Sequence, residues 1–177
     1  MKHLTKNKAA VPFSGTDIFD NTIQLKDYKG KKILLAFFRV ATCPFCNMAI
    51  QDLIRNHATF EEKGIQIIAL FASSKEEILK YAGKQNPPFP ILADPKFEIY
   101  KAYGVEISYG GMMKSMLNPK KVFKALSGGF FSMRSMKDKP IVPADFLIDE
   151  DQNIYKAYYG KDFGDHIPVT EVLEWKE

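Results

Sequence analysis

One stretch near residue 40 constrains the fold more than any other. Residues 33–38 are six apolar residues in a row, which is typical of a strand buried on both faces of a sheet that helices cover. A short turn follows, and Pro44 then stands where a first helical residue is expected, because the missing N–H of proline has no intrahelical partner at that position. The sequence therefore predicts a buried strand that passes directly into a helix.

The only two cysteines of the chain, Cys43 and Cys46, lie at this junction. Helical residues three positions apart share a face, so the two sulfurs can bond with little strain. We expect Cys43 near the N-cap, where unpaired backbone N–H groups and the positive end of the helix dipole stabilise a thiolate. The spacing predicts a reversible intramolecular disulfide, and the electrostatics of the helix start favour Cys43 as the nucleophile, with Cys46 as the resolving thiol.

Two other uses of a C-x-x-C pair fit the sequence less well. A zinc site needs two further ligands, but there are no more cysteines, and His3, His57 and His166 are scattered along the chain. A purely structural disulfide would close a loop of only a few residues and would remove little entropy from the unfolded chain. We therefore expect redox chemistry, with no metal and no cofactor.

Length and composition exclude several classes of protein. The 177 residues fit one domain, residues 1–177, and the net charge of +4 is too small to indicate a nucleic-acid partner. No apolar run approaches the ~20 residues of a membrane span. The basic N-terminus leads into no hydrophobic signal core, so we expect a cytoplasmic protein whose thiols cycle between two redox states.

The order of predicted elements is that of an α/β protein. Two apolar strands around the predicted helix form a parallel β-α-β unit, and Ser74 and Asp94 each begin a further helix. The remaining elements are an N-terminal hairpin at 18–25 with its turn at 20–21, the second strand of the β-α-β unit at 65–70, a hairpin at 146–159 around a turn at 149–153, and a closing helix at 169–175.

Residues 108–139 differ from the rest of the chain. They hold five of the seven methionines and seven Lys or Arg residues against a single acid, Asp138. One interpretation is an extra helical packing unit in which methionines fill irregular gaps. The other is a mobile cover or docking surface beside the cysteines that prefers anionic partners.

Several stretches of the sequence resemble the peroxiredoxin-like branch of the AhpC/TSA family, also called redoxins. The resemblance spans about residues 11–175 and rests on Phe37-Phe38-Arg39 followed by Cys43-Pro44-Phe45-Cys46-Asn47, and on residues 143–149 and 158–166. It implies a thioredoxin-like fold in its peroxiredoxin-like variant, with a central mixed sheet flanked by helices, an N-terminal β-hairpin and a helical insert at about 108–139.

This resemblance implies an antioxidant enzyme, a thiol-disulfide oxidoreductase that cycles Cys43 and Cys46. The implied partners are a thiol reductant of the thioredoxin or glutathione type and a disulfide or peroxide substrate, with no implication for the oligomeric state. The alternatives are a thiol peroxidase that reduces hydroperoxides, and a non-catalytic redox sensor or binding module. The chain also resembles thioredoxins, and the two resemblances imply different nucleophiles. Alignment with peroxiredoxins favours Cys46, whereas similarity to thioredoxins favours Cys43, exposed at the start of the helix, with Cys46 one turn further in and more covered.

Supporting roles follow from the same resemblance. Pro143 occupies the place of a cis-proline that faces the disulfide in thioredoxin-like proteins. Arg39 is placed to hold the thiolate or a substrate carboxylate, or is a solvated charge at the strand end. Thr42 stands where thioredoxins usually have Trp, and Pro44 begins the helix.

An acid–base pair and two substitutions complete the expected site. Asp165 and His166 are candidates for an acid–base pair near the cysteines. If Cys46 were the peroxide-attacking residue, Cys43 would fill the place of the usual Thr, and residues 141–143 offer no Arg, while Arg134 lies in the insert. We therefore expect disulfide exchange to outrun peroxide reduction.

Overall fold

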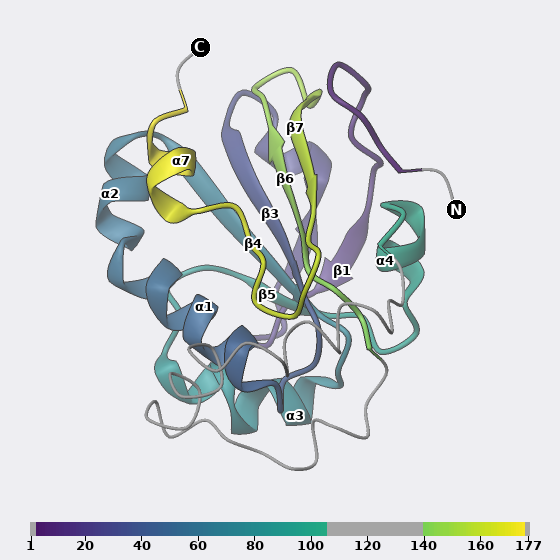
Figure 1. Ribbon diagram of the computed structural model, residues 1–177, viewed down its shortest axis with the longest axis vertical. Helices are drawn as coiled ribbons and strands as arrows, with labels where there is room; N and C mark the ends of the chain where they lie inside the picture. The colour runs from purple at the N-terminus through teal and green to yellow at the C-terminus, as the bar shows by residue number, and fades with distance from the viewer. Residues whose placement is uncertain (1–2, 106–139, 176–177) are drawn as a thin grey trace.

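The computed structural model describes residues 3–105 and 140–175. Its helices and strands follow the predicted order along the chain (Figure 1). The elements are β1 (Ser14–Thr16), β2 (Thr22–Gln24), the 3₁₀-helix η1 (Leu25–Tyr28), β3 (Lys32–Phe38), α1 (Pro44–Arg55), α2 (His57–Glu62), β4 (Ile65–Phe71), α3 (Lys75–Lys80), the 3₁₀-helix η2 (Ala82–Gln85), β5 (Ile91–Ala93), α4 (Glu98–Ala102), β6 (Ala144–Ile148), β7 (Ile154–Tyr159) and α7 (Val169–Leu173).

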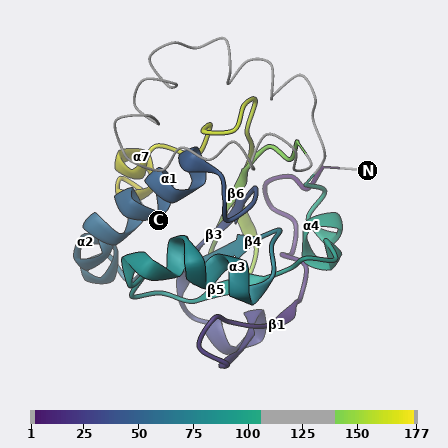
Figure 2. The ribbon, with the colours of Figure 1, turned by 90° about the horizontal axis from the view of Figure 1, so that it is seen from below.

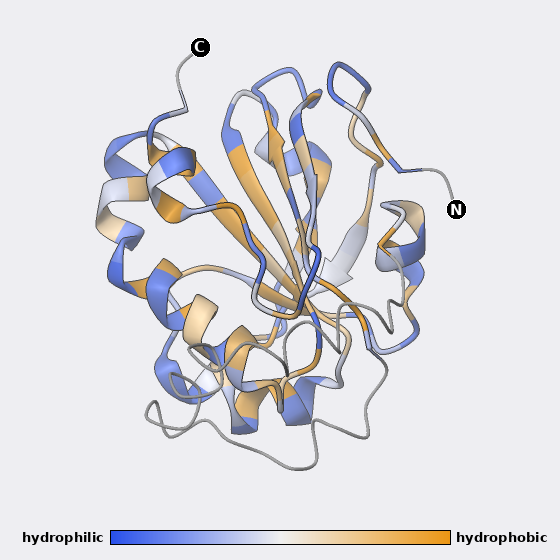
Figure 3. Ribbon diagram, in the orientation of Figure 1, coloured by the Kyte–Doolittle hydropathy of each residue, from blue (hydrophilic) through white to orange (hydrophobic). Residues whose placement is uncertain are grey.

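A five-stranded mixed sheet forms the centre of the fold, with strand order β5-β4-β3-β6-β7. The strands β3, β4 and β5 run parallel, as a β-α-β connection requires, whereas β6 is antiparallel to β3 and β7 is antiparallel to β6. The prediction of an α/β thioredoxin-like fold with a central mixed sheet is confirmed. The strand β3, which carries the six apolar residues 33–38, occupies the middle of the sheet, and both of its faces are covered (Figure 3).

Side chains alternate along the strands and so build two separate cores, one on each face of the sheet. Helices α1, α2, α3 and α7 pack on the face that carries Leu34, Ala36 and Phe38. Helix α4 and η1 pack on the other face, which carries Leu35 and Phe37. Figure 2 shows α1, α2 and α7 on one side of the sheet and α4 on the other.

The N-terminal hairpin is confirmed, but its first strand is not at Ile18 and Phe19. The strand β1 is Ser14–Thr16, and it pairs with β2. The reason is the side chain of Asp17, whose Oδ1 accepts hydrogen bonds from the N–H groups of Phe19 and Asn21 at 2.8 Å each and holds residues 17–21 as the turn. The side chain of Ile18 is buried in the core and that of Phe19 is 55% exposed.

Side-chain oxygens cap two helices as the sequence predicts. The hydroxyl of Ser74 accepts from the N–H of Glu77 at the start of α3. Before α4, the carboxylate of Asp94 accepts from three backbone N–H groups, those of Glu98, Ile99 and Tyr100. This carboxylate holds α4 against the sheet and so positions the Tyr100 ring.

The predicted insert at about 108–139, with Arg134 and its proposed role as a cover, lies outside the described residues. Within the described ranges, no helix is long and apolar enough to cross a membrane.

Candidate active site

The cysteines lie at the carboxyl end of the central strand, where the chain turns from β3 into α1. Cys43 has an extended backbone and is the N-cap residue of α1, and Pro44 is the first helical residue, as the sequence predicts. Cys46 follows within the first turn of the helix. Both cysteines are free thiols in this structure.

The two thiols are electrostatically different. The hydrogen bond that the Cys46 thiol donates to the Cys43 sulfur lowers the pKa of Cys43 to about 7, with smaller help from backbone N–H groups and from the charge of Arg39, and against the effect of burial. Burial, and then the neighbouring Cys43, raise the pKa of Cys46 well above its usual value. The first proton that the pair loses as the pH rises through neutrality therefore comes from Cys43, while Cys46 remains a thiol.

The expectation that Cys43 is exposed is wrong. Its side chain is 1% exposed and that of Cys46 is 0% exposed. The chain between β3 and α1 folds back on itself, because the N–H of Cys43 donates to the carbonyl of Val40 at 3.0 Å. A large substrate reaches the Cys43 sulfur only after neighbouring side chains move.

Arg39 is not a solvated charge at the end of β3, because its side chain is 2% exposed. Its guanidinium lies over the ring of Phe163, 4.4 Å from the ring centroid. This contact holds a permanent positive charge near Cys43. Thr42, the residue before Cys43, is also buried in the turn.

Asn47 holds the turn in place, a role that sequence reasoning missed. Its side-chain amide donates to the carbonyl of Ala41 at 2.7 Å and to that of Cys43 at 2.9 Å. The amide of Gln85 in turn donates to the backbone carbonyl of Asn47 at 3.1 Å. The sequence did contain a signal for this role, because in the C-P-F-C-N stretch the asparagine follows the first cysteine by four residues, about one helical turn.

Pro143 immediately precedes β6, whose first residue, Ala144, pairs with Phe37 near the carboxyl end of β3. The register thus puts Pro143 at the same end of the sheet as the cysteines. Its peptide bond is trans, so the expected cis-proline is wrong. The carbonyl of Pro143 accepts a hydrogen bond from the N–H of Gly160 at 2.8 Å. A Cβ atom on residue 160 would stand 2.9 Å from that carbonyl oxygen, so only glycine fits at this position.

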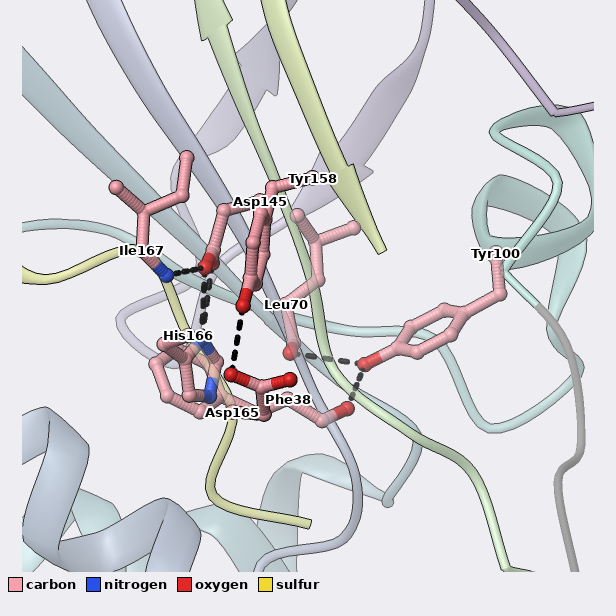
Figure 4. A network of polar contacts seen from close by, with 8 residues as sticks. All are labelled: Phe38, Leu70, Tyr100, Asp145, Tyr158, Asp165, His166 and Ile167. Atoms are coloured by element: carbon pink, nitrogen blue, oxygen red, sulfur yellow. Dashed lines mark hydrogen bonds and ion pairs between the residues drawn. The ribbon is translucent and has the colours of Figure 1, made fainter. Parts of the chain in front are cut away.

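The expected pairing of Asp165 with His166 is also wrong. The Nδ1 atom of His166 lies 2.9 Å from Oδ1 of Asp145 on β6, and Asp165 instead accepts from the hydroxyl of Tyr158 at 2.6 Å (Figure 4). That hydrogen bond, with burial, raises the pKa of Tyr158 to about 12. Asp145 was missed, although a lone acid inside an otherwise apolar strand is a signal of a partnered or functional carboxylate.

Tyr100 anchors the ends of two central strands from the other face of the sheet. Its hydroxyl donates to the carbonyls of Phe38 and of Leu70, the latter at 2.9 Å (Figure 4). The first of these carbonyls directly precedes the turn that carries the cysteines. Within the described ranges, no three His, Cys, Asp or Glu side chains gather as a metal site would require.

Comparisons with known proteins agree with this geometry. The sequence model of the AhpC/TSA family matches residues 7–157. A relative from Mycobacterium tuberculosis, provisionally named a peroxiredoxin, is 26% identical over 164 residues, which are 93% of this chain and 90% of the relative. A protein of Bacillus thuringiensis, the thiol-disulfide oxidoreductase ResA, is 36% identical over 99 residues, 55% of this chain and 57% of that protein.

The fold has solved counterparts. The crystal structure of the peroxidoxin BcpB from Mycobacterium tuberculosis superposes with a TM-score of 0.71 over 97% of this chain and 95% of that one, at 16% identity. Similarity at this identity supports the fold, and the two chains share the thioredoxin-like arrangement described above.

Proposed function

The chain belongs to the AhpC/TSA family, and from this premise we propose that it is a thiol-disulfide oxidoreductase that cycles Cys43 and Cys46 between dithiol and disulfide. Relatives named as peroxiredoxins and as thiol-disulfide oxidoreductases make the chain an oxidoreductase with a peroxiredoxin-like redox function. We take residues 1–177 as one domain of this family.

The observation that carries the proposal is the pair of free thiols at the start of α1, where the surroundings shift the two thiol pKa values in opposite directions. The Cys43 thiolate attacks one sulfur of a substrate disulfide, forms a mixed disulfide and releases the other sulfur as a thiolate. Cys46 then loses its proton and attacks the Cys43 sulfur, which closes the Cys43–Cys46 disulfide and releases the second substrate thiolate. The substrate disulfide is thereby reduced and the protein is oxidised.

An external dithiol or thiol must restore the reduced protein. We propose a reductant of the thioredoxin or glutathione type, which would reverse the same two steps and leave two thiols. Such a cycle fits a cytoplasmic location, which we also propose, because that compartment keeps thiols reduced. No metal or cofactor enters either step.

A thiol peroxidase is the second candidate, and the burial of Cys43 favours it. Hydrogen peroxide is small enough to reach a thiolate that is 1% exposed, whereas a protein disulfide is not. The sulfur would become a sulfenic acid, and Cys46 would condense with it, releasing water and forming the same disulfide. Against it stands the shortage of donors for the peroxide oxygens among the described residues. Arg39 is placed to serve, but residues 141–143 carry no arginine, and the position three residues before Cys43 holds Val40 instead of the usual Thr.

Stopped-flow rates of the reduced protein with hydrogen peroxide and with a small disulfide separate the two candidates. We expect the second-order rate constant for the disulfide to be the larger, because each missing donor typically costs ~10²–10³ in rate for the peroxide reaction. A peroxide rate constant well above the disulfide one would assign the chain as a peroxidase. If the protein reacts with neither compound but binds a partner in one redox state only, it is instead a sensor or binding module.

A further inference from the structure

The proposed cycle leaves one proton without a destination, and this inference rests on that cycle. Cys46 must lose its proton to attack the mixed disulfide, yet burial holds its pKa well above the usual range. The preceding strand offers no buried acid at Phe37, where thioredoxins resemble one another in carrying one. A proton acceptor must therefore come from another element.

A buried carboxylate and an imidazole form such a group on the face of the sheet beneath α1. Asp145 pairs in register with Ala36, so its side chain shares the face of that residue, and it is 2% exposed. Its Oδ2 accepts from the N–H of Ile167 at 2.7 Å, and its Oδ1 lies 2.9 Å from Nδ1 of His166. Because an ionised carboxylate only accepts hydrogen bonds, Nδ1 carries the hydrogen, and in the neutral ring Nε2 keeps a free lone pair.

The Nε2 atom of His166 is buried and has no hydrogen-bond partner among the residues the structure describes. Leaving a buried polar atom unpaired costs about 1–3 kcal/mol. An unpaired buried atom of this kind calls for an explanation, and one explanation is that it accepts a proton from the neighbouring thiols.

His166 lies close to the cysteine turn. Its ring packs on that of Phe38, with the centroids 4.7 Å apart, and Phe38 and Cys46 belong to the same buried core. Two residues earlier, Gly164 packs against Phe45, the neighbour of Cys46, since a Cβ built on Gly164 would stand 3.6 Å from the Phe45 Cβ. The segment that carries His166 therefore crosses the start of α1.

A cavity of about 170 Å³ lies between this imidazole and α1, and it ends one helical turn short of Cys46, which does not line it. His166 and Asp145 line it together with Ala49, which follows Cys46 by one helical turn. A cavity of this size has room for several water molecules, since the share of one water in the liquid is ~30 Å³. The remaining lining residues are Leu34, Ala36, Phe38, Asp52, Leu53, Gly164, Ile167, Pro168 and Val169.

We propose that Nε2 of His166 accepts the proton of Cys46, through water that enters from this cavity, when Cys46 attacks the mixed disulfide. The S–H bond of Cys46 breaks, the Cys43–Cys46 bond forms, and the bond from Cys43 to the substrate sulfur breaks with its electron pair on the leaving thiolate. The imidazolium then gives the proton to that thiolate or to solvent. Asp145 is the positioning residue, which fixes the tautomer and stabilises the imidazolium.

The other charged groups around His166 are compatible with this role. Asp52 of α1 lines the same cavity, and its carboxylate pairs with Arg55 at 3.6 Å. Asp165 is occupied by the Tyr158 hydroxyl, and Arg39 is stacked on Phe163. The acid that directly bonds the ring is Asp145.

The test follows the two steps separately with an aromatic disulfide that releases a coloured thiolate at each step. The first release reports attack by Cys43 and the second reports attack by Cys46. In His166→Ala we expect an unchanged first phase and a second phase slowed by about 10²-fold at pH 7, the usual worth of a general base. The second phase of the variant should rise by about tenfold per pH unit, more steeply than in the wild type, since hydroxide must replace the missing base.

Two further measurements separate proton transfer from a structural effect. Dissolved imidazole should restore the second phase of His166→Ala, and Asp145→Asn should slow that phase while His166 remains. The matched control is His57→Ala on α2, where the imidazole pairs with Glu61, and both phases should keep wild-type rates with or without imidazole.

The outcomes distinguish the inference from the function on which it rests. If wild-type protein releases fewer than two thiolates, the proposed dithiol cycle fails. If wild type, His166→Ala and Asp145→Asn all show the same second phase and the same pH profile, the cycle stands and the role of His166 is overturned. Should His166→Ala fail to fold, an unslowed second phase in Asp145→Asn would overturn it equally.

Discussion

The two faces of the central sheet are built for different purposes, and neighbouring residues of β6 show the contrast. Phe146 points into the face under α4, where its ring contacts those of Phe37, Tyr103 and Tyr159 at centroid distances of 5.6, 5.0 and 5.5 Å. Asp145 points to the face under α1, which also carries a cavity and both cysteines. Because side chains alternate along a strand, one short strand serves stability on one face and chemistry on the other.

The largest effect expected on the face under α1 is a loss of activity in a protein that still folds. Cys43→Ala removes the thiolate and leaves Cys46, whose pKa is raised, so disulfide exchange should fall by more than about 10³-fold. Stopped-flow release of a coloured thiolate measures the rate, and a cooperative urea unfolding transition checks that the variant is folded. Substantial exchange by Cys43→Ala would move the nucleophile to Cys46.

The opposite outcome is expected on the face under α4. Phe146→Ala leaves a cavity at the centre of the aromatic cluster and should lower the free energy of unfolding by about 3–5 kcal/mol, measured from urea midpoints. The matched control is Phe19→Ala, because that ring is 55% exposed and its loss should change stability by less than about 0.5 kcal/mol. Equal effects of the two substitutions would contradict the division of labour between the faces.

A smaller effect is expected where the two faces meet. Tyr100→Phe keeps the ring in the apolar core but removes the hydroxyl that bonds the carbonyls of Phe38 and Leu70. Leaving buried acceptors unpaired should cost about 1–3 kcal/mol of stability by urea unfolding. Since the Phe38 carbonyl leads into the cysteine turn, the rate of Cys43 alkylation should change slightly as well. An unchanged free energy of unfolding would show that the strand ends need no such anchor.

Local features of the site could be predicted from the sequence, since they depend on residues close together in the chain. The strand at 33–38, the helix start at Pro44 and the N-cap position of Cys43 follow from apolar runs and from the chemistry of helix ends. The N-terminal hairpin was predicted as well, but its first strand lies at residues 14–16 because the Asp17 side chain holds the residues after it in the turn.

Features that depend on the packing of distant segments could not be predicted. His166 is bonded to a residue 21 positions away, and only the register of β6 against β3 places that carboxylate under α1. The burial of Cys43 likewise depends on the core that segments distant in the chain build around it, which no local pattern encodes. Asp165 was predicted as the partner of His166 because the two residues are adjacent in the sequence. In the tertiary fold Asp145 bonds the imidazole, and Asp165 accepts from Tyr158.

The central claim is that a hydrogen bond from Cys46 makes Cys43 the thiolate of the pair, and alkylation as a function of pH tests it most directly. A small reagent, with the modified cysteine identified by mass spectrometry, should label Cys43 with a midpoint at about pH 7 and leave Cys46 unlabelled in that range. Cys46→Ser keeps a hydroxyl donor and should retain much of the shift, whereas Cys46→Ala removes the donor and should move the midpoint up towards the ordinary thiol value of 9.0. Labelling of Cys46 at the lower midpoint, with Cys43 reacting only at high pH, would contradict the account.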